Sequence, residues 1–87
     1  MEITVQRRQV LDNKEIFDRD FTYDSIEDLR RAIIEVIENW SNMHGSNTMA
    51  TFPSVQLKVG FRIVLSCAAN NDIETFEIKD IILADYS

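Results

Sequence analysis

The sequence predicts a single α+β domain in which two β-hairpins are joined by one helix, in the order ββαββ. Two segments rich in β-branched and aromatic residues, 2–11 and 15–23, are followed by one amphipathic stretch. A long alternation of apolar and polar residues comes next. The simplest arrangement is a four-stranded antiparallel sheet with the helix on one face, and 87 residues suffice for one domain, 1–87.

The segment Asp12-Asn13-Lys14 separates the first two predicted strands and is typical of a hairpin loop. A three-residue loop pairs Leu11 with Glu15 and sets Val5 opposite Phe21, so that apolar residues meet on one face. The same register places three further pairs opposite each other: Ile3 and Tyr23, Arg7 and Arg19, and Arg8 and Asp18.

Asp24 or Ser25 is predicted to cap the helix, because an acid follows each of them three positions later, at Glu27 and Asp28. Apolar residues then recur at intervals of three and four through about residue 42, which predicts one buried stripe. Gly45 is expected to end the helix. The stripe consists of Ile26, Leu29, Ile33, Val36, Ile37 and Trp40.

From Val55 to Cys67 the side chains alternate, which predicts a long, half-buried strand with a bend at Gly60. Asn70-Asn71 predicts a two-residue turn, after which the chain returns through residues 73–84. The resulting pairs are Leu65 with Phe76, Ile63 with Ile78, Val59 with Ile82 and Phe61 with Asp80.

Asp80 falls on the apolar side of this last strand, where an unpaired carboxylate would cost several kcal/mol. We therefore expect a bulge at Lys79-Asp80 that turns Asp80 outward.

Nine Lys and Arg residues against fifteen Asp and Glu residues give a net charge of -6, which disfavours direct binding of nucleic acid or of an anionic membrane. The negative charge is concentrated in the helix and in the last strand. Residues 24–42 hold 2 basic and 5 acidic side chains, and residues 72–87 hold 1 and 5. The start of the chain has no apolar leader, and Cys67 alone cannot form an internal disulfide, so a cytoplasmic location is expected.

A nucleophile paired with a base would need His44 and Cys67, the only histidine and the only thiol, within hydrogen-bond reach. Their positions after the helix and on the inward side of a strand instead indicate a loop histidine and a core thiol. A zinc site needs three or four ligands, and the phosphate-loop glycines are absent. The sequence therefore predicts no enzyme, no cofactor and no metal site. An enzyme that uses scattered carboxylates is the remaining alternative.

Three surfaces are candidates for interaction. The loop 43–54 is long and has no periodicity, which is typical of a mobile linker or of a functional loop. The end of the first hairpin is expected to project past the helix, because two opposed arginines cannot share a dry core. This arm holds Arg7, Arg8, Arg19, Val10 and Ile16. The outer face of the last strand combines Ile73, Ile81 and Leu83 with the acids Glu74, Glu77, Asp80 and Asp85.

These features predict a small, acidic, non-enzymatic binding or inhibitor protein that docks on a basic surface of a partner, such as one that normally holds nucleic acid. In size and acidity the chain resembles the small inhibitors of phages and mobile elements, such as anti-CRISPR and immunity proteins; the resemblance rests on no motif. The alternative is a structural or assembly subunit that forms a homodimer through the outer sheet face or an edge strand. The predicted contact residues are Glu27, Asp28, Glu35, Glu38, Glu74, Glu77, Asp85, Ile81 and Leu83.

Overall fold

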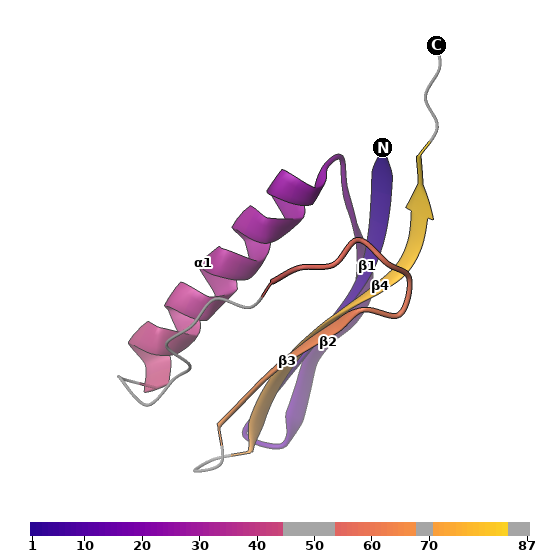
Figure 1. Cartoon of the computed structure of the whole chain (residues 1–87). Coiled ribbons are helices and arrows are strands. Elements are labelled where there is room, and N and C mark those ends of the chain that lie inside the picture. Colours follow the sequence, from indigo (N-terminus) through magenta and orange to yellow (C-terminus); the bar gives the residue numbers. More distant parts are fainter. Residues whose placement is uncertain (45–53, 68–70, 84–87) are drawn as a thin grey trace.

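A computed structural model of the chain describes residues 1–44, 54–67 and 71–83 (Figure 1). Within these residues, four antiparallel strands form one sheet and one helix lies across one of its faces, which confirms the predicted ββαββ fold. The strand order is β2-β1-β4-β3, so the central pair joins the first strand to the last. The elements are β1 (Glu2–Leu11), β2 (Lys14–Tyr23), α1 (Ile26–His44), β3 (Arg62–Cys67) and β4 (Asp72–Ile82).

The first hairpin has the predicted register, with Val5 opposite Phe21, but the predicted loop is wrong. Leu11 pairs with Lys14 across a two-residue turn, and the turn residues Asp12 and Asn13 have φ values of 54° and 65°. Positive φ at both central positions matches the twist of the flanking strands, which favours this turn over a longer loop. A register shift between Gln9 and Val10 absorbs the extra residue.

The helix begins where the sequence predicts. The hydroxyl oxygen of Ser25 accepts a hydrogen bond from the backbone N–H of Asp28 at 3.1 Å, and the Ser25 carbonyl accepts one from Leu29 at 3.2 Å. Ser25 is therefore the capping residue. The apolar stripe is confirmed as well: Leu29, Ile33, Val36 and Trp40 are buried, and Ile26 and Ile37 pack against them. Gly45, the predicted stop, lies outside the described residues.

The strand predicted over residues 55–67 is shorter than expected, since β3 begins only at Arg62. Gly60 has a φ of 95° and lies in a turn, although the turn stays bonded to β4. The Gly60 N–H donates to the Ile78 carbonyl at 2.8 Å, and the Ile78 N–H donates to the Phe61 carbonyl at 2.9 Å. An alternating pattern cannot reveal this break, because it reports side-chain faces and not backbone φ. As a result Leu57 and Val59 are exposed.

The second hairpin keeps the predicted faces but has a register that differs by two residues. Ile63 lies opposite Phe76, and Leu65 lies opposite Glu74. The connection is longer than the predicted two-residue turn and spans residues 68–71, of which Asn71 has a φ of 62° and Asn70 lies outside the described residues. Glu74 alternates with Phe76 and Ile78 on the inner face of the sheet, and this register sets it opposite Leu65.

The predicted bulge in the last strand is confirmed. Thr4 pairs with Asp80 whereas the next residue, Val5, pairs with Ile78, so Lys79 is the extra residue and Asp80 is exposed. The bulge also reverses the faces of the residues beyond it. Ile81 was expected on the outer face, and this is wrong: it lies opposite Ile3 and packs against the core.

The core lies between α1 and the inner sheet face, and the molecule measures 49 × 25 × 17 Å. The long axis follows the two hairpins, and the start of β1 and the end of β4 lie at one end of the sheet (Figure 1). In the described part of the chain, no helix has the length and apolar character needed to cross a membrane. The buried apolar residues are Ile3, Val5, Leu29, Ile33, Val36, Trp40, Val55, Ile63, Leu65, Phe76 and Ile78.

Candidate functional site

The solvent-facing side of α1 carries three of the nine predicted contact residues. Glu27, Glu35 and Glu38 are exposed, and Ile34 among them has 40% of its side-chain surface accessible. Glu27, Ile34 and Glu38 are spaced by seven and then four residues, so they lie along one side of the helix. Within the described residues no ion pair engages these three glutamates. We call Glu27, Ile34, Glu35 and Glu38 the acidic helix face; two exposed cations lie within it, Arg31 between Glu27 and Glu35 and Arg30 one turn before Ile34.

Two other predicted acids are accessible but engaged. Asp28 forms an ion pair with Arg31 at 3.2 Å, and Glu77 forms one with Lys79 at 3.6 Å. Such exposed pairs contribute little to stability. Asp28 and Glu35 also lie together in a shallow hollow of about 340 Å³ between α1 and the end of β2.

Glu74 was predicted on the surface, and this is wrong, because only 2% of it is accessible. Its Oε1 accepts hydrogen bonds from Trp40 Nε1 at 2.9 Å and from Gln9 Nε2 at 3.0 Å. Its Oε2 lies 3.7 Å from Arg7 Nη2. Glu74 lies on the same face of β4 as Phe76 and Ile78, which is the inner face, and these donors replace the water that a carboxylate needs.

Arg7 was expected on a projecting arm with Arg19, and for Arg7 this is also wrong. The two arginines do lie opposite each other, but only 16% of the Arg7 side chain is accessible. Its guanidinium carbon lies 4.6 Å from the ring centre of Phe21 and 4.7 Å from that of Phe76. Aromatic faces and the Glu74 carboxylate make burial of this cation tolerable. Arg8 and Ile16 of the predicted arm are exposed.

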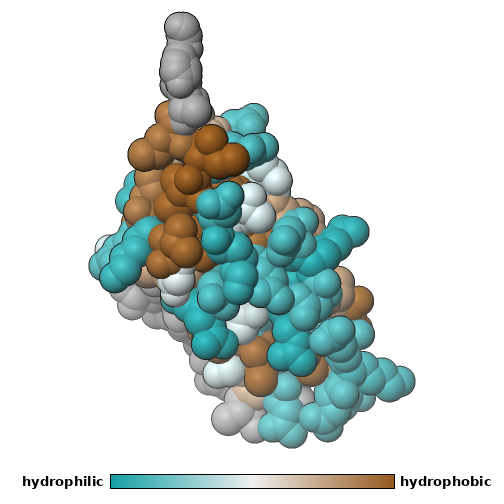
Figure 2. All heavy atoms as spheres, turned by 90° about the vertical axis from the view of Figure 1, so that its right-hand side faces the viewer, coloured by the Kyte–Doolittle hydropathy of each residue, from teal (hydrophilic) through white to brown (hydrophobic). Residues whose placement is uncertain are grey.

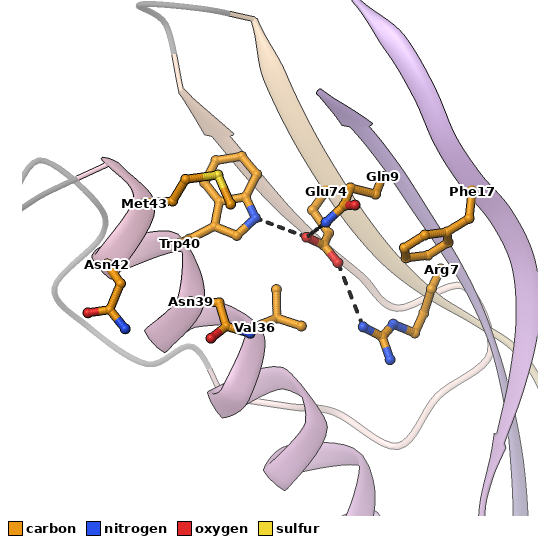
Figure 3. Close-up of a pocket in the computed structure, with 9 residues that line it drawn as sticks. All are labelled: Arg7, Gln9, Phe17, Val36, Asn39, Trp40, Asn42, Met43 and Glu74. Carbon is orange, nitrogen blue, oxygen red and sulfur yellow. Dashed lines mark hydrogen bonds and ion pairs between the residues drawn. The ribbon is translucent and has the colours of Figure 1, made fainter. Parts of the chain in front are cut away.

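A groove of about 480 Å³ opens between the C-terminal half of α1 and the sheet, next to this charged pair. Figure 3 shows Arg7 and Glu74 reaching toward each other from the sheet, with Trp40, Val36 and Asn39 facing them from the helix. The lining residues are Arg7, Gln9, Phe17, Val36, Asn39, Trp40, Asn42, Met43 and Glu74. We call this the Arg7 groove.

The sheet face opposite the helix is mostly hydrophilic, and apolar side chains gather at the end where β1 starts and β4 ends (Figure 2). Leu83, with 66% of its surface accessible, belongs to this end, as do Ile82 and Met1, since Glu2 pairs with Ile82. The turn before β3 brings the exposed Val59 close to the same end of β4. We call Met1, Val59, Ile82 and Leu83 the apolar end. Asp85, another predicted contact residue, lies outside the described residues.

Cys67 is a free thiol that is partly buried against the core. The side chain of His44 is outside the described part of the structure, as is most of the loop 43–54. Across residues 1–44, 54–67 and 71–83, no group of three His, Cys, Asp or Glu side chains is placed to hold a metal ion.

The sequence interpretation missed the Arg7 groove, although one signal for it was present. Arg7 and Glu74 are both charged residues at positions where the alternation points inward. An inward cation and an inward anion suggest a buried pair once their strands are known to be neighbours. The order β2-β1-β4-β3 supplies that fact, since Gln9 lies opposite Glu74 and Arg7 opposite Phe76.

Comparison of the chain with protein-family models gave no match, and comparison with curated proteins and with solved structures gave no significant match either. The class of protein is therefore defined by the fold alone: an α+β protein with one helix across a four-stranded antiparallel sheet.

Proposed function

We propose that this chain is a small non-enzymatic binding protein that docks on a basic surface of a partner protein through the acidic helix face. One observation carries the proposal. The glutamates Glu27, Glu35 and Glu38 are exposed around the partly exposed Ile34, and no ion pair among the described residues engages them. An apolar centre with a charged rim is the usual composition of a docking surface.

Charge on such a face acts mainly on the rate and selectivity of association. Complementary potentials steer the partner during diffusion and penalise partners of the wrong sign. The net charge of -6 supports a basic protein, and not nucleic acid itself, as the partner. Of the other predicted contact residues, Asp28, Glu77 and Leu83 are accessible on described surfaces, whereas Glu74 is not.

The proposal includes an inhibitor role and a cytoplasmic location. A protein of this kind would cover a basic surface that otherwise holds nucleic acid, as the resemblance to anti-CRISPR and immunity proteins suggests. The single cysteine suits a reducing compartment. Both points stay predictions.

The test is a quantitative pull-down that compares two matched triple variants at rising NaCl concentration. E27Q/E35Q/E38Q removes three charges from the acidic helix face, whereas E2Q/D20N/D80N removes three from exposed positions on the sheet. Loss of the three helix charges is expected to weaken partner capture about tenfold, at roughly 0.5 kcal/mol for each exposed contact, and the sheet variant is expected to retain it. Equal losses in both variants, or capture that is insensitive to salt, would contradict the proposal.

The apolar end supports a second candidate function, self-association as an assembly subunit. Its exposed side chains have accessible fractions from 45% to 66%. The edge of β2 is a poorer candidate, because five of its ten residues are charged: Lys14, Glu15, Asp18, Arg19 and Asp20. Charges along an edge strand oppose pairing with a second copy.

A further inference from the structure

We propose that the Arg7 groove binds a carboxylate attached to an apolar body, such as a free amphipathic acid or the C-terminal residue of a peptide. This site is separate from the acidic helix face and does not depend on it. The groove lies on the flank of α1 that faces the sheet. Val36, Asn39 and Trp40 line it from the helix, and Arg7 lines it from the sheet (Figure 3).

The first argument is that Arg7 has more donors than the protein satisfies. The described residues offer its guanidinium one hydrogen-bond acceptor, the Tyr23 hydroxyl oxygen, 3.1 Å from Nη1. Nη2 lies 3.7 Å from Glu74 Oε2, which is too long for a hydrogen bond, and Nε is buried without a partner. Burial of an underused cation is costly, so a further acceptor that reaches its terminal nitrogens gains from the interaction.

Glu74 is not a strong hydrogen-bond acceptor for the terminal nitrogens of Arg7. Its Oε1 already accepts from both Trp40 and Gln9, so two neutral donors hold its charge in place. Arg19 places a second positive charge near Arg7, because both guanidinium groups lie against the ring of Phe21. The guanidinium carbon of Arg19 is 4.8 Å from the centre of that ring. Arg19 is not among the residues that line the groove, whose charged members are Arg7 and Glu74, so the cation that a ligand meets there is Arg7.

The second argument comes from the walls of the groove. Phe17, Trp40, Val36 and Met43 present aromatic and aliphatic surface, and 54% of Met43 is accessible. Asn39 and Asn42 add carboxamides, which can donate to a carboxylate or bond to a peptide group. Apolar walls with a few placed polar groups are typical of sites for small amphipathic ligands, and a volume near 480 Å³ is within their range.

The local charge also limits the ligand to a single negative charge. Glu74 lies beside Arg7, and the acidic protein as a whole repels anions. A carboxylate carries one charge and fits the planar fork of a guanidinium. A phosphate group carries close to two charges at neutral pH and is disfavoured here.

The test is a titration with 3-phenylpropionate, followed by the fluorescence of Trp40, the only tryptophan, and by backbone amide NMR shifts. We expect saturable binding with a dissociation constant of roughly millimolar order for so small a ligand. The neutral 3-phenylpropanamide and inorganic phosphate are expected to bind at least about tenfold more weakly. Equal binding of the acid and its amide, or no saturable change with the acid, would overturn the proposal.

Variants locate the site without disturbing the buried pair. Asn39→Asp introduces a negative charge at the groove and is expected to weaken binding about tenfold or more, since it opposes the ligand carboxylate. Ser41→Asp adds the same charge at an exposed position on α1 outside the groove and should leave binding nearly unchanged. Equal effects of the two variants would contradict the assignment to the groove.

A peptide ending in phenylalanine, with a free or an amidated C-terminus, distinguishes the two sources of the carboxylate. Tighter binding of the free-acid peptide than of 3-phenylpropionate assigns the site to a chain terminus, and equal binding assigns it to a free acid; both results support the proposal. Equal binding of the free and amidated peptides would count against it. None of these measurements involves the acidic helix face, so failure here leaves the proposed function intact.

Discussion

The side chains of Arg7 and Glu74 are both largely buried when β1 and β4 pair. The charge of each side chain offsets the cost of burying the other. The guanidinium is held between aromatic rings, while the carboxylate accepts from Trp40 and Gln9. The removal of one partner from a buried pair is far more damaging than the removal of both, because it leaves an uncompensated charge. The pair is therefore a local determinant of how the inner sheet face packs.

We predict that Glu74→Leu lowers the free energy of unfolding by about 3 kcal/mol, because Arg7 loses its counterion and Trp40 loses its acceptor. Arg7→Met should cost a similar amount, about 3 kcal/mol, since it strands the carboxylate. The double variant R7M/E74L should be more stable than either single variant. Urea unfolding followed by Trp40 fluorescence measures all three. Additive losses in the double variant would show that the two side chains do not depend on each other.

The inward positions of Arg7 and Glu74 follow from alternation, whereas their pairing does not. Alternation gives the face on which a residue lies, and Val5 with Arg7, or Glu74 with Phe76, shows it plainly. It does not give the residue opposite. That depends on strand order and on the length of the connection at residues 68–71. Glu74 was expected at the surface although it shares the inward parity of Phe76.

At the scale of elements, α1 is the part of the fold that the sequence specifies best. Its cap, its apolar stripe and its acidic side each depend on residues close together in the chain. The Ser25 hydroxyl accepts from Asp28 at the first turn, and Leu29 and Trp40 on the stripe are almost fully buried. Local interactions of this kind are visible in sequence because their geometry is fixed by the helix itself.

We predict that Ser25→Ala lowers the free energy of unfolding by about 1 kcal/mol, because the amide of Asp28 loses its acceptor. Ser25→Asp should restore most of the loss, since aspartate also caps helices and suits the positive end of the helix dipole. Thermal unfolding followed by circular dichroism at 222 nm measures both variants. An unchanged midpoint in Ser25→Ala would mean that this hydrogen bond does not stabilise the helix start.

The strands were predicted less well, because their ends depend on backbone conformation. Residues 55–67 do not form one continuous strand, because the chain turns at Gly60 and β3 begins only at Arg62. Apart from Gly60 and its chain neighbours, no atom lies within 4 Å of a Cβ built at this position. Its φ of 95°, and not a lack of space, therefore favours glycine there. The turn at Asp12-Asn13 also depends on backbone conformation. Positive φ at both residues allows a two-residue turn, and the register shift between Gln9 and Val10 accommodates the extra residue in β2.

At the scale of the whole molecule, the apolar end holds four of the ten large apolar side chains that are exposed among the described residues. The acidic helix face lies on the solvent side of α1, and the apolar end lies where β1 starts and β4 ends (Figure 2). Exposed apolar side chains that gather in one place favour contact with another surface. Whether that surface is a second copy of the chain is a question of oligomeric state.

We predict that self-association, if it occurs through the apolar end, is weakened roughly thirtyfold by V59K/L83K, because two exposed apolar side chains that would be buried in the interface give about 2 kcal/mol. Ile16→Lys is the control, since Ile16 is 52% exposed near the opposite end of the first hairpin. Sedimentation equilibrium over a range of concentrations measures the effect. A wild-type chain that stays monomeric at every concentration would remove this second candidate function.

The sequence by itself determined the order of the elements, the buried stripe of the helix and the acidic character of that helix, because periodicity and capping are local properties of the chain. The bulge at Lys79-Asp80 was also within reach, since a buried lone carboxylate is too costly to retain. Only the tertiary structure decided that β1 lies beside β4 and that Glu74 lies opposite Gln9. These contacts join residues far apart in the chain, and it is they that bury Arg7 with Glu74 and shape the groove beside them.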